Sequence, residues 1–169
     1  MTFMELCTNR HSVRGYLPDA VPQEKLDYIL ECARHAPSAA NRQPWKIYLV
    51  SGAAKARLDA AYDRPWFKEA PLAVAFVGKT LENWQRGDGT NYLMCDIAII
   101  CDHFTLAAAD VGLGTCWIGA FQRDAARRVL QLPEDEIPFS LSPLGYPKTG
   151  ATRVKERKAL AEILVRLDA

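Results

Sequence analysis

Apolar residues recur at helical spacing in several stretches of the chain. The longest such stretch covers residues 90–111, and glycines follow it where a helix would end. A second helix is predicted over residues 22–36, because proline suits the first turn of a helix and a further proline stops it. A short helix is predicted over residues 2–9, where Thr2 and Glu5 have the spacing of a capping box.

Strand-like stretches lie between these helices. Residues 72–78 form a continuous apolar run, which is typical of a strand buried on both faces. Residues 46–51 alternate in the manner of a strand with one exposed face. The remaining elements are a short strand at residues 115–119, a strand within residues 138–147, and helices at residues 53–62 and 124–130. Helices mixed with about four strands predict α+β or mixed α/β layers built on one sheet.

Composition and charge are those of an ordinary globular protein. The 169 residues suit one domain over the whole range 1–169, and the net charge of +1 gives no general attraction to nucleic acid or membrane. The N-terminus lacks the basic start and apolar core of a signal peptide, and the five cysteines include no CxxC pair. The chain is therefore expected to be cytoplasmic, with reduced thiols and no metal site.

Three polar clusters interrupt the apolar pattern. They consist of Arg10, His11, Ser12 and Arg14; of the polar residues in PSAANRQPW, residues 37–45; and of Lys148, Arg153, Lys155, Arg157 and Lys158. Arginine binds two phosphate oxygens at once, so the first and third clusters could close on one phosphate. Each cluster also has a plainer interpretation: charge that stabilises a helix end, side chains that cap local backbone, or a solvated basic surface.

Four motifs contain or adjoin these clusters: NRHSVRGY at residues 9–16, APSAANRQPW at 36–45, GLGTCWIGAF at 112–121, and GYP with VKERK at 145–158. In this order they resemble the nitroreductase family, the FMN-dependent NAD(P)H oxidoreductases. The chain departs from the family in reading Asn9-Arg10-His11 where consecutive arginines are frequent. It is also short for the family, which leaves little room for long C-terminal arms or a roofed pocket.

The resemblance implies a role for each residue of the first and last motifs. Arg10 and Ser12 match residues that contact the phosphate and ribityl chain of FMN, and His11 lies between them. Arg14 matches the cation at the pyrimidine edge of the flavin, where a fixed guanidinium would favour reduction. Lys155 and Arg157 match the family's phosphate-binding K-x-R pair.

The second motif implies contacts across a subunit interface. In the family this loop reaches the FMN of the partner subunit. Ser38 and Asn41 would then bond to the ribityl chain and the ring edge, with the Pro37 carbonyl and Gln43 nearby. The prolines would keep the loop rigid. Local capping by Asn41 and Gln43 remains the alternative.

The third motif matches the segment beside the flavin nitrogen that accepts hydride. Trp117, Ile118 and Gly119 correspond to this segment, and the backbone N–H of Gly119 would be the useful group because glycine allows close approach. Core packing is an equally good interpretation of the Trp117 side chain. No catalytic side chain is implied, since the flavin carries the chemistry.

The resemblance also implies fold, assembly and reaction. It implies a central, mostly antiparallel sheet of four to five strands flanked by helices, with the long helix at a homodimer interface. FMN would pass hydride from NADH or NADPH to a nitroaromatic or quinone type of acceptor, in ping-pong order. Three alternatives stay open: a flavin-binding module without turnover, a binder of a phosphate ligand without flavin, and a reductive dehalogenase or flavin-modifying relative.

Overall fold

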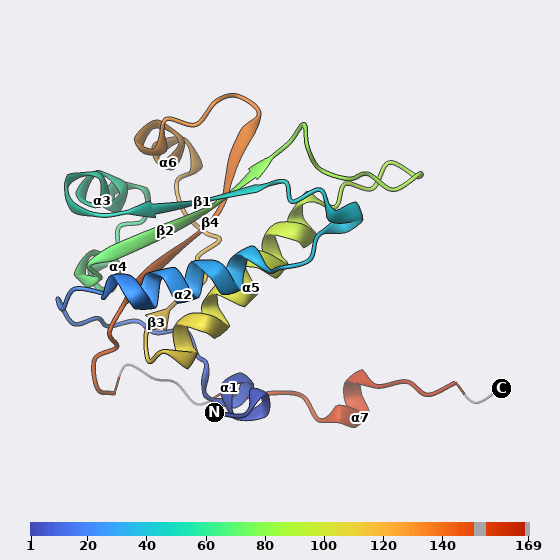
Figure 1. The fold of residues 1–169 in the computed structure, drawn as a ribbon, viewed down its shortest axis with the longest axis horizontal. Coiled ribbons are helices and arrows are strands. Elements are labelled where there is room, and N and C mark those ends of the chain that lie inside the picture. The colour runs from blue at the N-terminus through green and yellow to red at the C-terminus, as the bar shows by residue number, and fades with distance from the viewer. Residues whose placement is uncertain (151–154, 168–169) are drawn as a thin grey trace.

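A four-stranded antiparallel sheet forms the centre of the computed structural model, which describes residues 1–150 and 155–167 (Figure 1). Its strands are β1 (Trp45–Val50), β2 (Leu72–Lys79), β3 (Gly114–Thr115) and β4 (Glu136–Gly145). They lie in the order β1-β2-β4-β3, and each neighbouring pair is antiparallel. The predicted antiparallel sheet is thus confirmed.

Helices cover both faces of the sheet. Helices α2 (Gln23–Arg34) and α5 (Leu93–Asp110) pack on one face, and α3 (Gly52–Leu58) and α6 (Arg123–Leu130) pack on the other (Figure 1). The short helices are α1 (Phe3–Asn9), α4 (Pro65–Glu69) and α7 (Leu160–Ile163), and the 3-10 turns are η1 (Ala39–Asn41) and η2 (Asp59–Ala61).

Strand β2 lies between the two helical layers, and this position explains its apolar sequence. Val74 and Phe76 point into the core formed with α2 and α5, while the intervening residues point into the core formed with α3 and α6. Phe76 meets Phe104 of α5 edge to face, with ring centroids 5.3 Å apart. Burial of an aromatic side chain of this size stabilises the fold by about 1.5–3 kcal/mol.

The capping box at the first helix is confirmed. The Thr2 hydroxyl accepts the N–H of Glu5 at 3.2 Å, and the Glu5 carboxylate accepts the N–H of Thr2 at 2.7 Å. Helix α5 begins at Leu93 instead of Thr90; its N-cap is Tyr92, and just before it the Asn91 side chain accepts the Leu93 N–H at 2.8 Å in a local turn.

Other predicted boundaries were wrong by a few residues. Pro22 is the N-cap of α2, which ends at Arg34 before reaching Pro37. The helix predicted at residues 53–62 is α3 followed by the η2 turn. The strand predicted at residues 115–119 pairs with β4 only over Gly114–Thr115, and it touches β4 again through an isolated bridge at Ile118. Helices α4 and α7 were not predicted.

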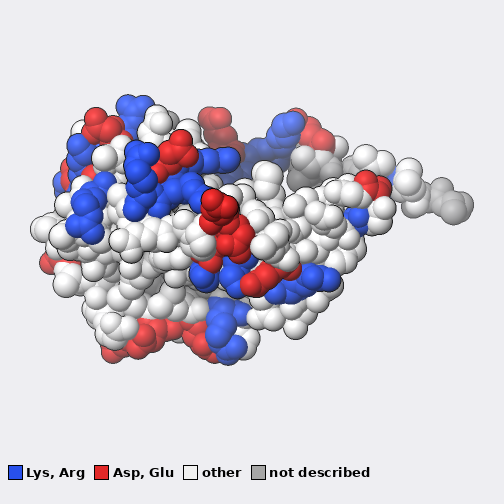
Figure 2. Space-filling view, turned by 90° about the horizontal axis from the view of Figure 1, so that it is seen from above, with Lys and Arg blue, Asp and Glu red and all other residues white. Residues whose placement is uncertain are grey.

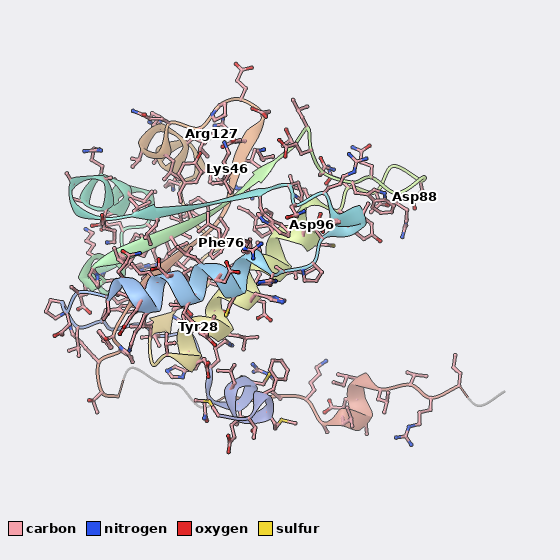
Figure 3. All side chains as sticks on the ribbon, in the orientation of Figure 1. Tyr28, Lys46, Phe76, Asp88, Asp96 and Arg127 are labelled. Carbon is pink, nitrogen blue, oxygen red and sulfur yellow. The ribbon has the colours of Figure 1, made fainter. Side chains whose placement is uncertain are left out.

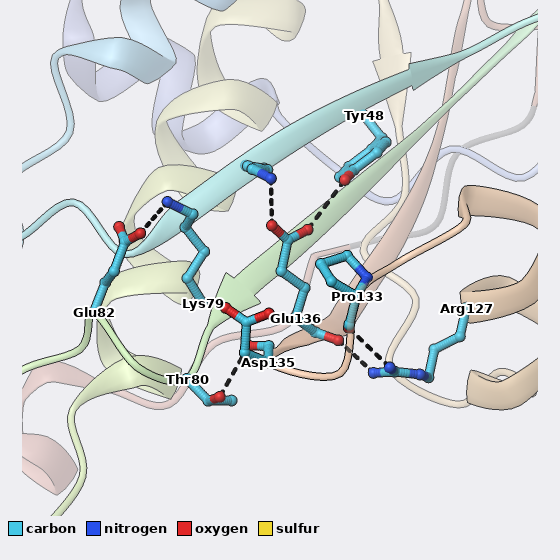
Figure 4. Close-up of polar contacts among 9 residues, drawn as sticks. Tyr48, Lys79, Thr80, Glu82, Arg127, Pro133, Asp135 and Glu136 are labelled. Carbon is cyan, nitrogen blue, oxygen red and sulfur yellow. Dashed lines mark hydrogen bonds and ion pairs between the residues drawn. The ribbon is translucent and has the colours of Figure 1, made fainter.

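A buried carboxylate on β4 links this strand to side chains of β1 (Figure 4). Glu136 on β4 is 2% exposed, forms an ion pair with Lys46 of β1, and accepts the Tyr48 hydroxyl at 3.1 Å. Arg127 of α6 donates to the backbone carbonyls of Glu136 and, at 2.9 Å, of Pro133. Because buried charges are tolerated only when paired, this network makes Glu136 structural.

Positive and negative side chains share the surface, as the nearly equal numbers of basic and acidic residues in the sequence predict. On the face seen in Figure 2, basic and acidic side chains are interspersed. Within residues 1–150 and 155–167, each helix is too short or too polar to cross a membrane.

Candidate functional site

The first polar cluster lies where the chain leaves α1 and runs along the edge strand β3. The N–H of Val13 donates to the carbonyl of Thr115 at 2.8 Å, and Ser12 pairs with Thr115 in a parallel bridge. Farther on, the N–H of Tyr16 donates to the Glu69 carboxylate at 3.2 Å. These bonds fix the backbone of residues 12–16 and so fix the direction of its polar side chains.

The C-terminal segment closes on this cluster. The Lys155 ammonium donates to the carbonyl of Cys7 and, at 3.1 Å, to the carbonyl of Arg10. A cavity of about 170 Å³ is lined by Arg10, His11, Ser12, Arg14, Lys155, Glu156 and Arg157. The first and third clusters therefore meet, as the phosphate hypothesis requires.

Other members of the third cluster lie elsewhere. Lys148 forms an ion pair with Glu69 at 3.1 Å, and Lys158 is exposed outside the cavity lining. Arg153 lies outside the described residues. The cavity thus draws on the K-x-R pair and not on the basic run as a whole.

Positive charge is crowded around this cavity. Burial, followed by the charges of Arg10 and Arg157, lowers the pKa of Lys155. Glu156 is the single acidic residue among the lining residues that the structure describes. An anion that accepts several hydrogen bonds at once would relieve this repulsion, and phosphate is such an anion.

His11 adds a buried nitrogen without a partner. Its Nδ1 lies 2.8 Å from the carbonyl oxygen of Asn9, and its Nε2 is buried with no hydrogen-bond partner in the described part of the chain. A carbonyl can only accept, so Nδ1 carries the hydrogen and Nε2 of the neutral ring is a free acceptor. The donors that line the cavity itself, the Ser12 hydroxyl and the guanidinium groups of Arg10 and Arg157, fit the phosphate of FMN.

Arg14 lies next to helix α4. Its guanidinium carbon is 5.9 Å from the ring centre of Trp66, within the range of a cation–π contact. Arg14 also acts on the Cys116 thiol: burial raises the pKa of this thiol, and the charge of Arg14 opposes the shift. A thiol with a raised pKa stays protonated at neutral pH, so Cys116 contributes no competing charge.

Helix α4 makes two contacts with this region that the sequence did not predict. Trp66 contacts Arg14, and Glu69 holds the backbone of Tyr16. The available signal was Pro65, which occupies the first turn of α4 where proline is favoured. The spacing alone does not reveal that this short helix faces residues 12–16.

Residues 117–119 of the third motif alternate between exposed and buried positions. Trp117 is 39% exposed, so core packing does not describe its side chain, whereas Ile118 is 4% exposed and packs in the core. Gly119 faces open space, since a Cβ atom there would meet nothing within 4 Å. A broad hollow of about 760 Å³ begins directly after it, lined by residues 60–64 and 120–122.

The second cluster lies at the opposite end of α5. The N–H of Ala39 donates to Asp96, in the first turn of α5, at 2.8 Å. His11 and Arg10 instead border a cavity that includes Ala109, near the end of α5. The helix between Asp96 and Ala109 is about 20 Å long. One chain therefore does not bring Ser38, Asn41 and the other predicted loop residues to the first cluster.

Within the chain, the predicted loop residues bond to one another. The Ser38 hydroxyl accepts the N–H of Gln43 at 2.9 Å. The Gln43 amide donates to the Asn41 side chain at 3.2 Å and to its carbonyl at 3.1 Å. Pro37 is exposed at the start of this loop. Local capping thus describes these side chains in the isolated chain.

Known proteins match the chain over most of its length. The model of the nitroreductase family matches residues 7–86 and 59–146. A Methanothermobacter thermautotrophicus protein with the provisional name NADH dehydrogenase/NAD(P)H nitroreductase is 32% identical over 156 residues, covering 87% of this chain and 78% of that protein. The Bacillus subtilis FMN reductase (NAD(P)H) is 30% identical over 158 residues, covering 83% and 64%.

A solved structure agrees with this result. A nitroreductase family protein from Clostridium difficile 630 superposes with a TM-score of 0.86 at 31% identity, and the match covers 98% of both chains. Identity at this level over whole chains, together with the family match, settles the relationship. The chain belongs to the nitroreductase family.

Proposed function

We propose that this chain is an FMN-dependent oxidoreductase that transfers hydride from NAD(P)H to an electron-poor acceptor such as a nitroaromatic or a quinone. The observation that carries the proposal is the cavity in which Arg10, Ser12 and Arg157 converge. Relatives named as an NAD(P)H nitroreductase and an FMN reductase support the same cofactor and donor.

The phosphate of FMN is assigned to the cationic cavity. Arg10, Ser12 and Arg157 supply the donors, because charge-assisted hydrogen bonds to phosphate are the strongest available here. Lys155 has a different role in this proposal. Its ammonium already donates to two backbone carbonyls, so it fixes the position of Arg10 and the start of the C-terminal segment.

Bound FMN supplies the hydride-transfer chemistry, with donor and acceptor using one face in turn. Arg14 provides positive charge at the ring edge, and Trp66 restricts the position of that guanidinium through their contact. The open space beside the Gly119 Cα would allow a flat ring to approach the backbone of the third motif closely. The hollow beside residues 120–122 offers room for a second flat molecule.

We also propose a homodimer in which the Ser38–Gln43 loop of one subunit completes the site of the other. The loop lies too far from the first cluster to act on it within one chain. Large apolar side chains are exposed on α1, on the outer side of α5 and along the C-terminal segment: Phe3, Met4, Met94, Leu160, Ile163, Leu164, Val165 and Leu167. Exposed apolar surface on this scale favours contact with a second subunit.

A reducing compartment, the cytoplasm, is part of the same proposal. All five cysteines are free, and two of them, Cys101 and Cys116, are buried as thiols. Disulfides are rare in the cytosol, so free buried thiols suit this location.

The direct test is an absorption spectrum of the purified protein after incubation with FMN and removal of unbound flavin, followed by anaerobic NADH or NADPH. Retained flavin that bleaches with either nucleotide, and is reoxidised by a nitroaromatic or quinone, supports the proposal. Flavin that stays oxidised supports a binding module without turnover. Protein that retains no flavin contradicts the proposal, and oxidation by halogenated phenols alone identifies a dehalogenase.

A further inference from the structure

Asp96 is a buried acid that the proposed chemistry does not use. It lies in the first turn of α5, at the end of that helix nearest η1 (Figure 3), and it is 1% exposed. Oδ1 accepts the N–H of Ala39 at 2.8 Å, and Oδ2 is buried without a partner among the described residues. A carboxylate is costly to bury unless hydrogen bonds compensate it, so this position needs an explanation.

The loop that Asp96 contacts is strained. Ala40, Asn41 and Gln43 have φ values of 49°, 53° and 51°, in the left-handed region that residues with a Cβ atom rarely adopt. Such conformations persist only where surrounding contacts hold them. They are concentrated in the stretch that carries the predicted flavin-facing side chains.

Most hydrogen bonds of this loop are local. The Gln43 N–H bonds to Ser38, the Asn41 N–H bonds to the Ser38 carbonyl, and the Gln43 side chain bonds to Asn41. These bonds shape the loop but do not fix its direction relative to the body. In the described part of the chain, the Ala39–Asp96 bond is the one hydrogen bond of residues 38–43 to a residue distant in sequence.

We propose that Asp96 is a positioning residue that anchors the Ser38–Gln43 loop to α5 and so aims its hydroxyl and amides at the flavin of the second subunit. Burial raises the pKa of Asp96, and the hydrogen bond from the Ala39 N–H opposes this shift, so the loop contact and the carboxylate stabilise each other. The anchoring step rests on the contacts of this chain alone. The effect on flavin rests on the proposed function.

The test compares Asp96→Ala with Asp96→Asn, which keeps a side-chain oxygen that can accept the Ala39 N–H. Thr105→Val is the matched control, because it removes a buried hydroxyl bond of α5, to Asp102 at 3.1 Å, and leaves the loop untouched. Hydrogen exchange of the amides at residues 39–43 is measured without flavin. FMN affinity and the melting temperature are measured on the same samples.

Asp96→Ala is expected to raise exchange at Ala39 and to weaken FMN binding about fivefold, the effect of one lost hydrogen bond. Asp96→Asn is expected to restore both quantities, whereas Thr105→Val lowers the melting temperature and leaves both unchanged. Unchanged exchange in Asp96→Ala overturns the anchor. Faster exchange with unchanged FMN affinity overturns the positioning role. If the wild-type chain binds no FMN, the proposed function and the flavin role fail together, while the exchange data still decide the anchor.

Discussion

The two polar regions of the proposed flavin site are built by different means. Residues 10–14 have no positive φ values and contact β3 and α4. The C-terminal segment completes their cavity within one chain. The Ser38–Gln43 loop lies at the other end of α5, in strained backbone with one distant anchor. In the proposed function, the first region forms its anion site within one chain, whereas the second contacts a ligand only in a dimer.

The two regions are therefore expected to control different properties, namely the affinity for FMN and the activity of the assembled dimer. The cationic cavity should decide whether FMN binds, because its charges already repel one another in the single chain. The loop should decide how well the site works after two subunits meet. Changes to the first region are therefore expected to have larger effects than changes to the second.

The largest effect is expected from Arg10→Ala and Arg157→Ala. Each removes charge-assisted hydrogen bonds to phosphate, so FMN affinity should fall by roughly 10- to 100-fold. Fluorescence titration of FMN measures this loss. Lys158→Ala is the control, since Lys158 is exposed and does not line the cavity. Equal FMN affinities for Arg10→Ala and Lys158→Ala would show that the FMN phosphate does not bind in this cavity.

Arg14→Ala should slow flavin reduction by about tenfold while FMN affinity changes little. The guanidinium favours the negative charge of the reduced ring and does not face the phosphate in this account. Stopped-flow bleaching with NADH or NADPH gives the rate, and Arg57→Ala is the control, because Arg57 is exposed on α3 and belongs to the lining of neither the cavity nor the hollow. A variant that keeps a normal reduction rate would show that Arg14 is not at the ring edge.

In the loop, Ala40→Gly should leave the free energy of unfolding nearly unchanged, because relief of the positive φ offsets the extra freedom of glycine in the unfolded chain. The same substitution at exposed Ala56, inside α3, should cost about 0.5–1 kcal/mol. Urea denaturation of both variants measures the difference. Equal losses would mean that Ala40 is not strained.

The smallest effect concerns Glu69, which links α4 to residues 12–16. The N–H of Tyr16, followed by Lys148, lowers the pKa of Glu69 below its ordinary value of 4.5. A lowered pKa stabilises the fold fully above pH 4.5, and this contribution is lost as pH falls through the folded-state value. Glu69→Gln should therefore be less stable than wild type at neutral pH and approach it in acid. A stability difference that grows in acid would contradict this sign.

Local signals predicted much of the fold. The capping box at Thr2, the helical spacing of α2 and the apolar run of β2 each depend on neighbouring residues. Helix α4 was missed because its role depends on contacts such as Glu69 to Tyr16, 53 positions apart. Asp96 was missed because one acid on a long helix resembles an exposed position, and nothing in an alanine indicates the positive φ of Ala40.

The site residues were predicted from a resemblance, and the structure places them in two separate regions. Arg10, Ser12 and Arg157 converge as expected, while Lys155 binds backbone carbonyls in the chain. The loop residues could not be judged from one chain, because their proposed ligand belongs to a second copy. That dependence on a second subunit is the central claim.

Subunit mixing tests this claim most directly. Arg10→Ala disables the cationic cavity, and Asn41→Asp disables the loop while keeping a residue type that tolerates positive φ. Each variant is expected to be poorly active alone. If the loop acts across the interface, a purified heterodimer of the two has one intact site of two and should recover about half of the wild-type reductase activity. A heterodimer as inactive as its parents would place both regions in the same site of one chain and contradict the account.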